Sequence, residues 1–177
     1  MALVRWKRLS TEVLHENPFW RYRRDVFERE GGTTGQYFYV STHGSVMIVP
    51  VLDDGRFVLV EQYRYLSDRF SLEFPAGGMH ADEKPAVAAV RELAEETGYE
   101  GSLELLGSHN PCNGLVDEIC HVFRATGLVA MPEPPKGDDT ESFTIHRLTA
   151  DEVKRKIRDG TIWDGMTLAA WALVGEK

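Results

Sequence analysis

Polar residues alternate with apolar or aromatic ones over much of the first 41 residues, as in FWRYRRDVF and QYFYVST. A period of two is typical of strands with one buried and one exposed face. The turn-rich run GGTTG separates these two stretches. The pattern therefore predicts two or three strands, which form a small N-terminal antiparallel β-sheet over residues 1–44.

Two apolar runs follow, GSVMIVPVL and GRFVLVEQYRY, on either side of Asp53-Asp54-Gly55. A short acidic turn that ends in glycine predicts that the two runs pair as a hairpin. The first run is apolar throughout, which is typical of a buried strand. A short strand, SLEF, then leads into the loop PAGGMHADEK.

Residues 85–97 show the periodicity of a helix. Pro85 is favourable in a first turn, and Gly98 is a typical stop after the last one. Side chains that can pack in a core recur at the spacing i, i+4, i+7 and i+11, which places them on one face of a helix. This spacing predicts a core-facing stripe of Ala86, Val90, Leu93 and Thr97. On this interpretation Glu92, Glu95 and Glu96 fall on another side of the helix.

The remaining chain contains further strands and two helices. The pattern predicts strands at 101–108 and 117–125, a loop in MPEPPKGDDTES, a strand in FTIHRL, and helices at about 149–159 and 164–175. Strands mixed with a few helices predict an α/β (α+β) sandwich, with helices on a central sheet, over residues 45–177.

Composition narrows the classes of function. The chain has 177 residues and a net charge of −8, without a long Lys or Arg run, so it lacks the basic surface of a nucleic-acid-binding protein. No stretch reaches 18 apolar residues, so we expect no membrane span and no signal peptide. Cys112 and Cys120 lie outside any CxxC pair, and we expect reduced thiols in the cytoplasm, with one disulfide as the alternative.

The end of the predicted helix, RELAEETG, has an unfavourable charge pattern. Carboxylates near a helix C-terminus are destabilising by roughly 0.3–1 kcal/mol each. Glu92 and Glu96 also repel each other at the spacing i, i+4. A divalent cation would compensate this repulsion, and hard cations such as Mg²⁺ prefer oxygen ligands. The alternative is a solvated acidic face without a ligand.

The loop and helix together resemble the Nudix box, whose pattern is G-x5-E-x7-R-E-U-x-E-E-x-G-U with U apolar or aromatic. Every position matches, with Gly77, Glu83, Arg91, Glu92, Leu93, Glu95, Glu96, Gly98 and Tyr99. The resemblance implies a Nudix-type α/β/α sandwich with a mixed central sheet. It also implies hydrolysis of a nucleoside diphosphate linked to another moiety.

The same resemblance implies the metal ligands. Glu92 and Glu96 correspond to catalytic metal ligands of the family, helped by a backbone carbonyl that is here Ala76. The expected cofactor is about two or three Mg²⁺ ions, for which Mn²⁺ can substitute. In the family the arginine of the box orients a glutamate, and Arg91 can pair with Glu95 at i, i+4.

Upstream, EQYRY and SLEFPAGG resemble the branch that hydrolyses ADP-ribose and other nucleoside diphosphate sugars. There the arginine contacts the diphosphate, so Arg64 is the expected phosphate clamp. Glu73 is a candidate for contacting the sugar or a metal-bound water. The stretch PCNGLVDE is similar to a segment that lines the sugar pocket, which makes Glu118 a substrate-binding candidate, although Cys112 and Asn113 interrupt the match.

The catalytic base and the N-terminal sheet are also inferred from the branch. The acidic loop KGDDTES precedes a strand, as does the loop that delivers the base, so Glu141 is the first choice and Asp139 the second. The N-terminal strands of this branch often exchange across a homodimer. Trp20, with Phe19 and Tyr22, would stack a purine or pack in the core.

The leading hypothesis is a Mg²⁺-dependent hydrolase of nucleoside diphosphate sugars, of the ADP-ribose or GDP-mannose class, that releases a nucleoside monophosphate and a sugar phosphate. One alternative is a Nudix hydrolase of nucleoside triphosphates or dinucleoside polyphosphates. Another is a nucleotide sensor without turnover.

Overall fold

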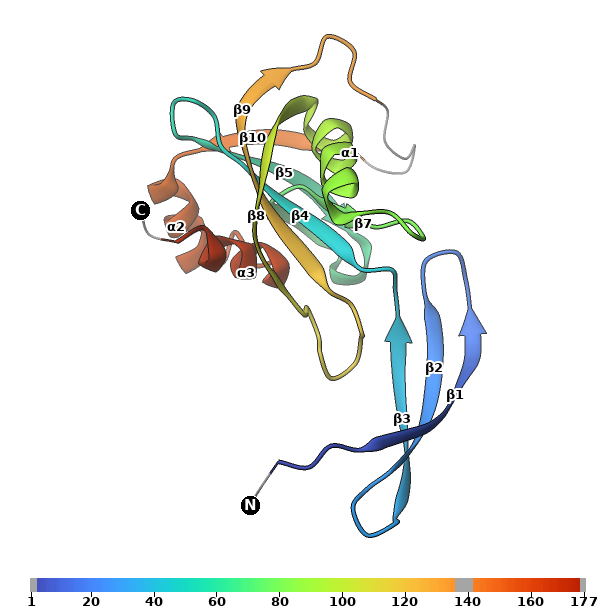
Figure 1. Ribbon diagram of the computed structural model, residues 1–177. Helices are drawn as coiled ribbons and strands as arrows, with labels where there is room; N and C mark the ends of the chain where they lie inside the picture. Colours follow the sequence, from blue (N-terminus) through green and yellow to red (C-terminus); the bar gives the residue numbers. More distant parts are fainter. Residues whose placement is uncertain (1–2, 136–141, 176–177) are drawn as a thin grey trace. The chain divides into compact units, whose positions relative to one another are not determined.

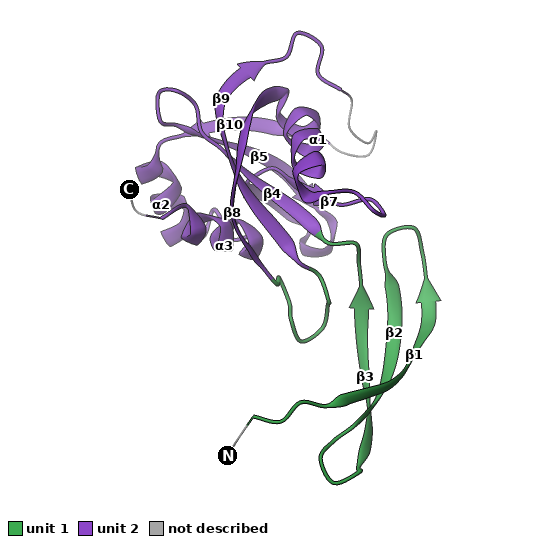
Figure 2. Ribbon diagram, viewed as in Figure 1, with its two compact units in different colours: residues 1–44, 110–118 green, residues 45–109, 119–177 purple. Residues whose placement is uncertain are grey.

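The computed structural model describes residues 3–135 and 142–175, and the chain folds as two units. The first unit contains residues 1–44 and 110–118, and the second contains residues 45–109 and 119–177 (Figure 2). The second unit therefore includes the whole stretch that resembles the Nudix box.

The first unit is an antiparallel sheet in the order β1-β2-β3 (Figure 1). Its strands are β1 (Lys7–Glu16), β2 (Arg21–Glu28) and β3 (Thr34–Ser41), which confirms strands in the alternating N-terminal stretch. Residues 110–118 lie along β3, since the Val40 N–H donates to the carbonyl of Leu115 at 2.9 Å. The Tyr37 hydroxyl also donates to the carbonyl of Gly114 at 2.8 Å.

The sheet of the first unit buries little apolar surface within its own unit. Every residue of β1 is exposed, and Phe27, which stacks on Trp6 at 4.3 Å between ring centroids, is the one buried apolar residue among the described part of this unit. Exposed apolar side chains on it include Leu9, Val13 and Leu14. Apolar side chains that stay exposed within a unit are candidates for burial against a partner.

The second unit contains two sheets. The first has the order β7-β4-β9-β8, with β7 (Ala76–Gly78), β4 (Ser45–Pro50), β9 (Cys120–Ala130) and β8 (Tyr99–His109). In it β4 runs parallel to β9 and antiparallel to β7, so the sheet is mixed. The second sheet is antiparallel, in the order β10-β5-β6, with β10 (Thr144–Leu148), β5 (Phe57–Arg64) and β6 (Arg69–Glu73). The short 3₁₀ helix η1 (Tyr65–Ser67) joins β5 to β6.

The predicted hairpin between the two apolar runs is wrong. A turn does form, since the Leu52 N–H donates to the Arg56 carbonyl at 2.8 Å, but only an isolated bridge joins Val51 to Phe57. Beyond that bridge β4 and β5 separate into different sheets. Every residue of β4 is buried, so it is more favourable as a central strand between β7 and β9 than beside β5.

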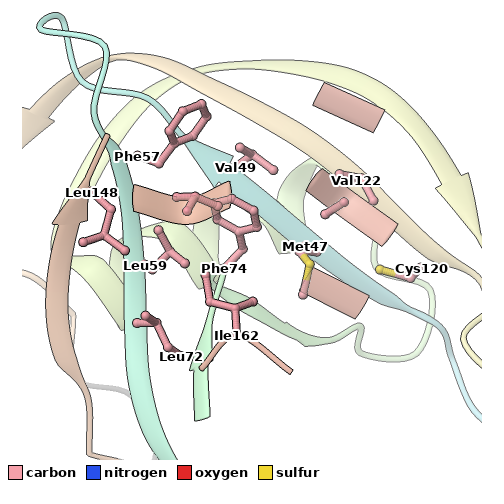
Figure 3. Packing of buried hydrophobic residues seen from close by; sticks show 12 residues of the cluster. Met47, Val49, Phe57, Leu59, Leu72, Phe74, Cys120, Val122, Leu148 and Ile162 are labelled. Atoms are coloured by element: carbon pink, nitrogen blue, oxygen red, sulfur yellow. The ribbon is translucent and has the colours of Figure 1, made fainter. Parts of the chain in front are cut away.

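Helices cover both faces of the mixed sheet, as predicted. Val46 and Ile48 of β4 pack in one cluster with residues of α1 (Pro85–Thr97). Met47 and Val49 point to the opposite face, into a larger cluster to which α2 (Ala150–Arg158) and α3 (Gly165–Val174) contribute (Figure 3). The alternation along β4 therefore places the sheet between two helical layers. None of the helices in the described residues is long and apolar enough to cross a bilayer.

The helix α1 has the predicted bounds, but its buried face differs from the predicted stripe. Leu93 and Thr97 are buried as expected, whereas Ala86 and Val90 are exposed. The buried face instead includes Ala88 and Ala89, together with the two glutamates Glu92 and Glu96. Two small alanines let the helix approach the sheet closely, and this rotation carries the carboxylates inward. The prediction that these glutamates face away from the core is therefore wrong.

Candidate active site

Glu92 and Glu96 lie on the face of α1 that packs against β7. They are 8% and 7% exposed, so both carboxylates are largely withdrawn from solvent. The Ala76 N–H donates to Glu96 Oε2 at 3.1 Å, which ties the end of the helix to the first residue of β7. This hydrogen bond provides a partner for one oxygen of a carboxylate that is largely shielded from water.

Gly77 is a close neighbour of the Glu92 carboxylate. A Cβ atom built on Gly77 would lie 2.0 Å from Glu92 Oε1, so any other residue at this position would force the Glu92 carboxylate to move. The absence of a side chain at this position therefore creates the space in which the Glu92 carboxylate lies. A Cβ on Gly78 would meet no described atom within 4 Å, so the same explanation does not extend to the second glycine.

Arg91 connects the glutamates of the box. Its Nη1 donates to Glu92 at 2.6 Å and to Glu95 at 3.2 Å, which confirms the predicted i, i+4 pair. Its Nε and Nη2 donate to the two carboxylate oxygens of Glu83 at 3.2 and 3.1 Å. Nη2 also donates to the Gly78 carbonyl at 3.0 Å, so one guanidinium joins the loop, β7 and α1.

The charges of this network support one another. Partial burial opposes the Arg91 charge, but hydrogen bonds to Glu83 and Glu92 more than offset it and raise the pKa of Arg91. The hydrogen bond from Arg91 lowers the pKa of Glu83 below its ordinary value. Both groups therefore remain ionised at neutral pH. The positive charge of Arg91, which lies beside these carboxylates, reduces the repulsion among them.

Arg64 and Glu73 form a second charged pair, on the paired strands β5 and β6. Arg64 Nε donates to Glu73 Oε1 at 2.8 Å, and its Nη2 donates to Oε2, so the contact is bidentate. Glu73 is 1% exposed, whereas the Arg64 side chain is 44% exposed. The hydrogen bonds that Arg64 donates to Glu73 raise the pKa of Arg64. The buried carboxylate thus fixes the plane of a guanidinium whose outer edge faces solvent.

The carboxylates of α1 fit the requirements of a Mg²⁺ site. Two buried oxygen donors lie one helical turn apart, and the Gly77 backbone leaves room beside one of them. In the described ranges, no three His, Cys, Asp or Glu side chains come together as a complete metal-binding group. That is compatible with Mg²⁺, which is usually held by one or two carboxylates, with water and substrate phosphates as further ligands.

The other predicted site residues are distributed over the two units. Trp20 and Glu118 belong to the first unit. Trp20 lines a cavity of about 140 Å³, and its backbone N–H donates to Asn17 Oδ1 at 2.9 Å. The Glu118 carbonyl accepts a hydrogen bond from Asn110 at 2.8 Å. Glu141 and Asp139, the candidates for the base, lie outside the described residues.

Two residues of the second unit received no role from the sequence. Glu83 anchors Arg91 from the loop before the helix, and its fixed place in the box pattern was the signal that could have identified it. Gln62 reaches Glu73 at a long 3.5 Å, and it lies in the stretch EQYRY, from which only Arg64 was given a role.

The comparisons with known proteins agree with the fold. A family profile described as NUDIX domain matches residues 41–166. The chain is 33% identical to a methanol dehydrogenase activator from Bacillus methanolicus, over 93% of this chain and 89% of that protein. It is 31% identical to an ADP-ribose pyrophosphatase from Bacillus subtilis, over 84% of this chain and 80% of that protein. A crystal structure of an ADP compounds hydrolase superposes with a TM-score of 0.84 at 24% identity, covering 98% of this chain and 94% of the other.

Proposed function

Because the chain belongs to the NUDIX family and is a pyrophosphohydrolase, we propose that it hydrolyses the pyrophosphate bond of nucleoside diphosphate sugars, of the ADP-ribose or GDP-mannose class. The products are a nucleoside monophosphate and a sugar phosphate. The observation that carries this proposal is the pair of buried carboxylates, Glu92 and Glu96, against the backbone of β7. The similarity to an ADP-ribose pyrophosphatase supports the substrate class.

The reaction requires Mg²⁺ in this proposal. Glu92 and Glu96, with the carbonyl of Ala76, would hold about two or three ions, which when bound neutralise phosphate charge and lower the pKa of water. Mn²⁺ can replace Mg²⁺, since it also prefers oxygen ligands. Arg91 keeps the glutamates in place through its bonds to Glu92 and Glu95.

Arg64 binds the diphosphate. Its exposed edge presents N–H donors in a plane, and this geometry suits phosphate oxygens. Glu73 positions the Arg64 guanidinium by accepting its hydrogen bonds. This role differs from the direct contact with sugar or metal-bound water expected from the sequence. Pre-oriented donors cost less entropy on binding than free ones.

The general base is Glu141, with Asp139 as the second choice. The support is their place in the acidic stretch KGDDTES, which the sequence predicts to be a loop before a strand. A loop that closes over substrate can bring a carboxylate to the attacking water. Glu118 and Trp20 are assigned to the sugar and the base of the substrate by resemblance to the branch. Trp20 is partly exposed, as a stacking residue must be.

We further propose a cytoplasmic homodimer that exchanges its N-terminal strands. The exposed apolar side chains of β1 support the dimer. Cys112 is an exposed free thiol, which agrees with a reducing compartment.

Product analysis tests the function directly. We expect ADP-ribose or GDP-mannose to yield AMP or GMP and a sugar phosphate, with Mg²⁺ but not with EDTA, as read by chromatography. Glu96→Gln should lower kcat by at least about a hundredfold, because it removes a ligand charge while preserving the shape of the side chain. Glu100→Gln, at an exposed position just after the box, is the matched control and should retain activity.

Near-normal turnover in Glu96→Gln would refute the metal assignment. Absence of turnover on these substrates, with activity on nucleoside triphosphates or dinucleoside polyphosphates, would replace the substrate class. Ligand binding without any product would support a sensor instead.

A further inference from the structure

The second unit contains a cavity that lies away from the Nudix box. It has a volume of about 550 Å³, within the range of small-molecule sites, and it lies beside α2 and α3. Since α1, which contains Glu92 and Glu96, covers the opposite face of the mixed sheet from α2 and α3, this cavity is separate from the carboxylate site (Figure 1). No residue given a role in hydrolysis lines it.

One wall of the cavity is apolar and aromatic. It includes Val51, Phe57 and Trp171. Phe57 meets Trp171 edge to face at 5.1 Å between ring centroids, and the buried Phe74 stacks against Trp171 at 6.4 Å. These contacts fix the orientation of the indole before any ligand enters, so a flat apolar molecule finds a preformed surface.

The other wall is cationic. Arg124 and Lys154 both line the cavity, and none of its described lining residues is acidic. Arg124 donates to the Val174 carbonyl at 3.1 Å, and its nearest carboxylate, that of the exposed Glu104, is 3.9 Å away. Lys154 forms no ion pair with any described residue. The two side chains therefore keep positive charge available next to an apolar wall.

We propose that this cavity binds a small planar apolar molecule that carries one carboxylate. The ring would lie against Trp171 and Phe57, and the carboxylate would meet Lys154 and Arg124. An amphipathic anion fits both walls, whereas a neutral ring leaves the cations without a partner and a fully polar anion leaves the apolar wall exposed.

The test uses 2-naphthoate as the probe and the full chain as the protein. Isothermal titration calorimetry should show saturable binding at one site. In nuclear magnetic resonance spectra the indole N–H signal of Trp171 should shift, while those of Trp6, Trp20 and Trp163 stay in place. The signal of Trp171 is identified by its loss in Trp171→Phe. 2-Naphthalenemethanol, which has the same ring without the charge, should bind about fivefold more weakly or worse.

Variants of lining residues test the contributions of the cavity and of its cationic wall to binding. Ala172→Phe places a ring in the cavity from an exposed helical position and should abolish binding. Lys154→Met should weaken binding of 2-naphthoate about fivefold, whereas Lys156→Met, on the same helix but outside the cavity lining, should leave it unchanged.

Failure of the wild-type chain to bind either probe in a saturable way would overturn the proposal. Equal affinity of the two probes for the wild-type chain would overturn the role of the cations, whatever the variants do. Binding that shifts Trp6 or Trp20 instead of Trp171 would move the site to the first unit and also contradict it.

Discussion

Single side chains around β7 explain why the box has these residue types. Gly77 provides space for Glu92, and Arg91 holds Glu83, Glu92 and Glu95 together. The spacing of the motif predicted the Arg91–Glu95 pair, which is confirmed, but not the contacts of Arg91 with Glu83 and Glu92. It did not predict that Glu92 is buried, because a carboxylate is ordinarily assigned to solvent unless its partners are known.

Replacing Gly77 by alanine should disrupt the site. The new methyl group would overlap the Glu92 carboxylate, so we expect a loss of about 1–3 kcal/mol in the free energy of unfolding and at least about a tenfold loss of turnover. Denaturant unfolding and hydrolysis of ADP-ribose measure the two effects. Gly78→Ala is the matched control, since its Cβ meets open space, and an equal effect of both substitutions would contradict the steric explanation.

Arg91 should affect stability in a pH-dependent manner. The pKa of Glu83 is lowered in the folded state from its ordinary value of 4.5, chiefly by the hydrogen bond from Arg91. Around and below pH 4.5, Glu83 binds more protons in the unfolded chain than in the folded chain. The stabilisation that ionised Glu83 gives the folded state is therefore present above pH 4.5 and is lost as the pH falls through the folded pKa.

Urea unfolding of the wild-type chain and Arg91→Met should therefore differ most near neutral pH, and the difference should narrow below pH 4.5. Arg158→Met, at an exposed position of α2, is the control. A gap between wild type and Arg91→Met that stays constant with pH would show that Arg91 acts through packing alone.

At the scale of elements, the orientation of α1 determines the site. Its bounds follow from local signals, Pro85 at the start and Gly98 in the left-handed conformation at the end. Its rotation follows from packing, since Ala88 and Ala89 face the sheet while Val90 stays exposed. A helix with both small and large apolar residues has more than one plausible buried stripe, and the shape of the sheet selects between them.

Enlarging Ala88 should disturb the packing of α1 on β4. Ala88 is fully buried, so Ala88→Leu should cost about 1–3 kcal/mol of unfolding free energy and lower turnover by displacing Glu92 and Glu96. Val87→Leu, at a neighbouring position that is 57% exposed, should change neither. Thermal unfolding and a steady-state assay measure both quantities, and an unchanged melting temperature for Ala88→Leu would refute this packing.

At the scale of the whole molecule, the first unit requires a partner in our proposal. Its strand β1 is exposed along its full length, and a three-stranded sheet with so little buried apolar surface is marginal alone. Alternation predicted the strands but not their exposure, because a pattern of two faces does not say what covers the apolar one.

Charged residues on β1 should weaken the proposed dimer. The double substitution Leu9→Lys and Val13→Lys should raise the dissociation constant at least about tenfold, measured by sedimentation equilibrium, since it places two charges in an apolar interface. The double substitution Val87→Lys and Val129→Lys, at exposed positions of the second unit, is the control. Sedimentation of the wild-type chain as a monomer would contradict the dimer.

Local patterns in the chain were sufficient for the positions of the helices and of most strands, because turns, caps and motif spacing depend on neighbouring residues. They did not predict β7 (Ala76–Gly78), which lies within the stretch predicted as the loop PAGGMHADEK. Long-range packing settled the rest. The separation of β4 from β5 into two sheets, the burial of Glu92 and Glu96, and the pairing of Arg64 with Glu73 each depend on contacts between residues or elements whose pairing no local period encodes. Burial and strand pairing are properties of neighbours in space, so they emerge only when the sheets and helices have packed.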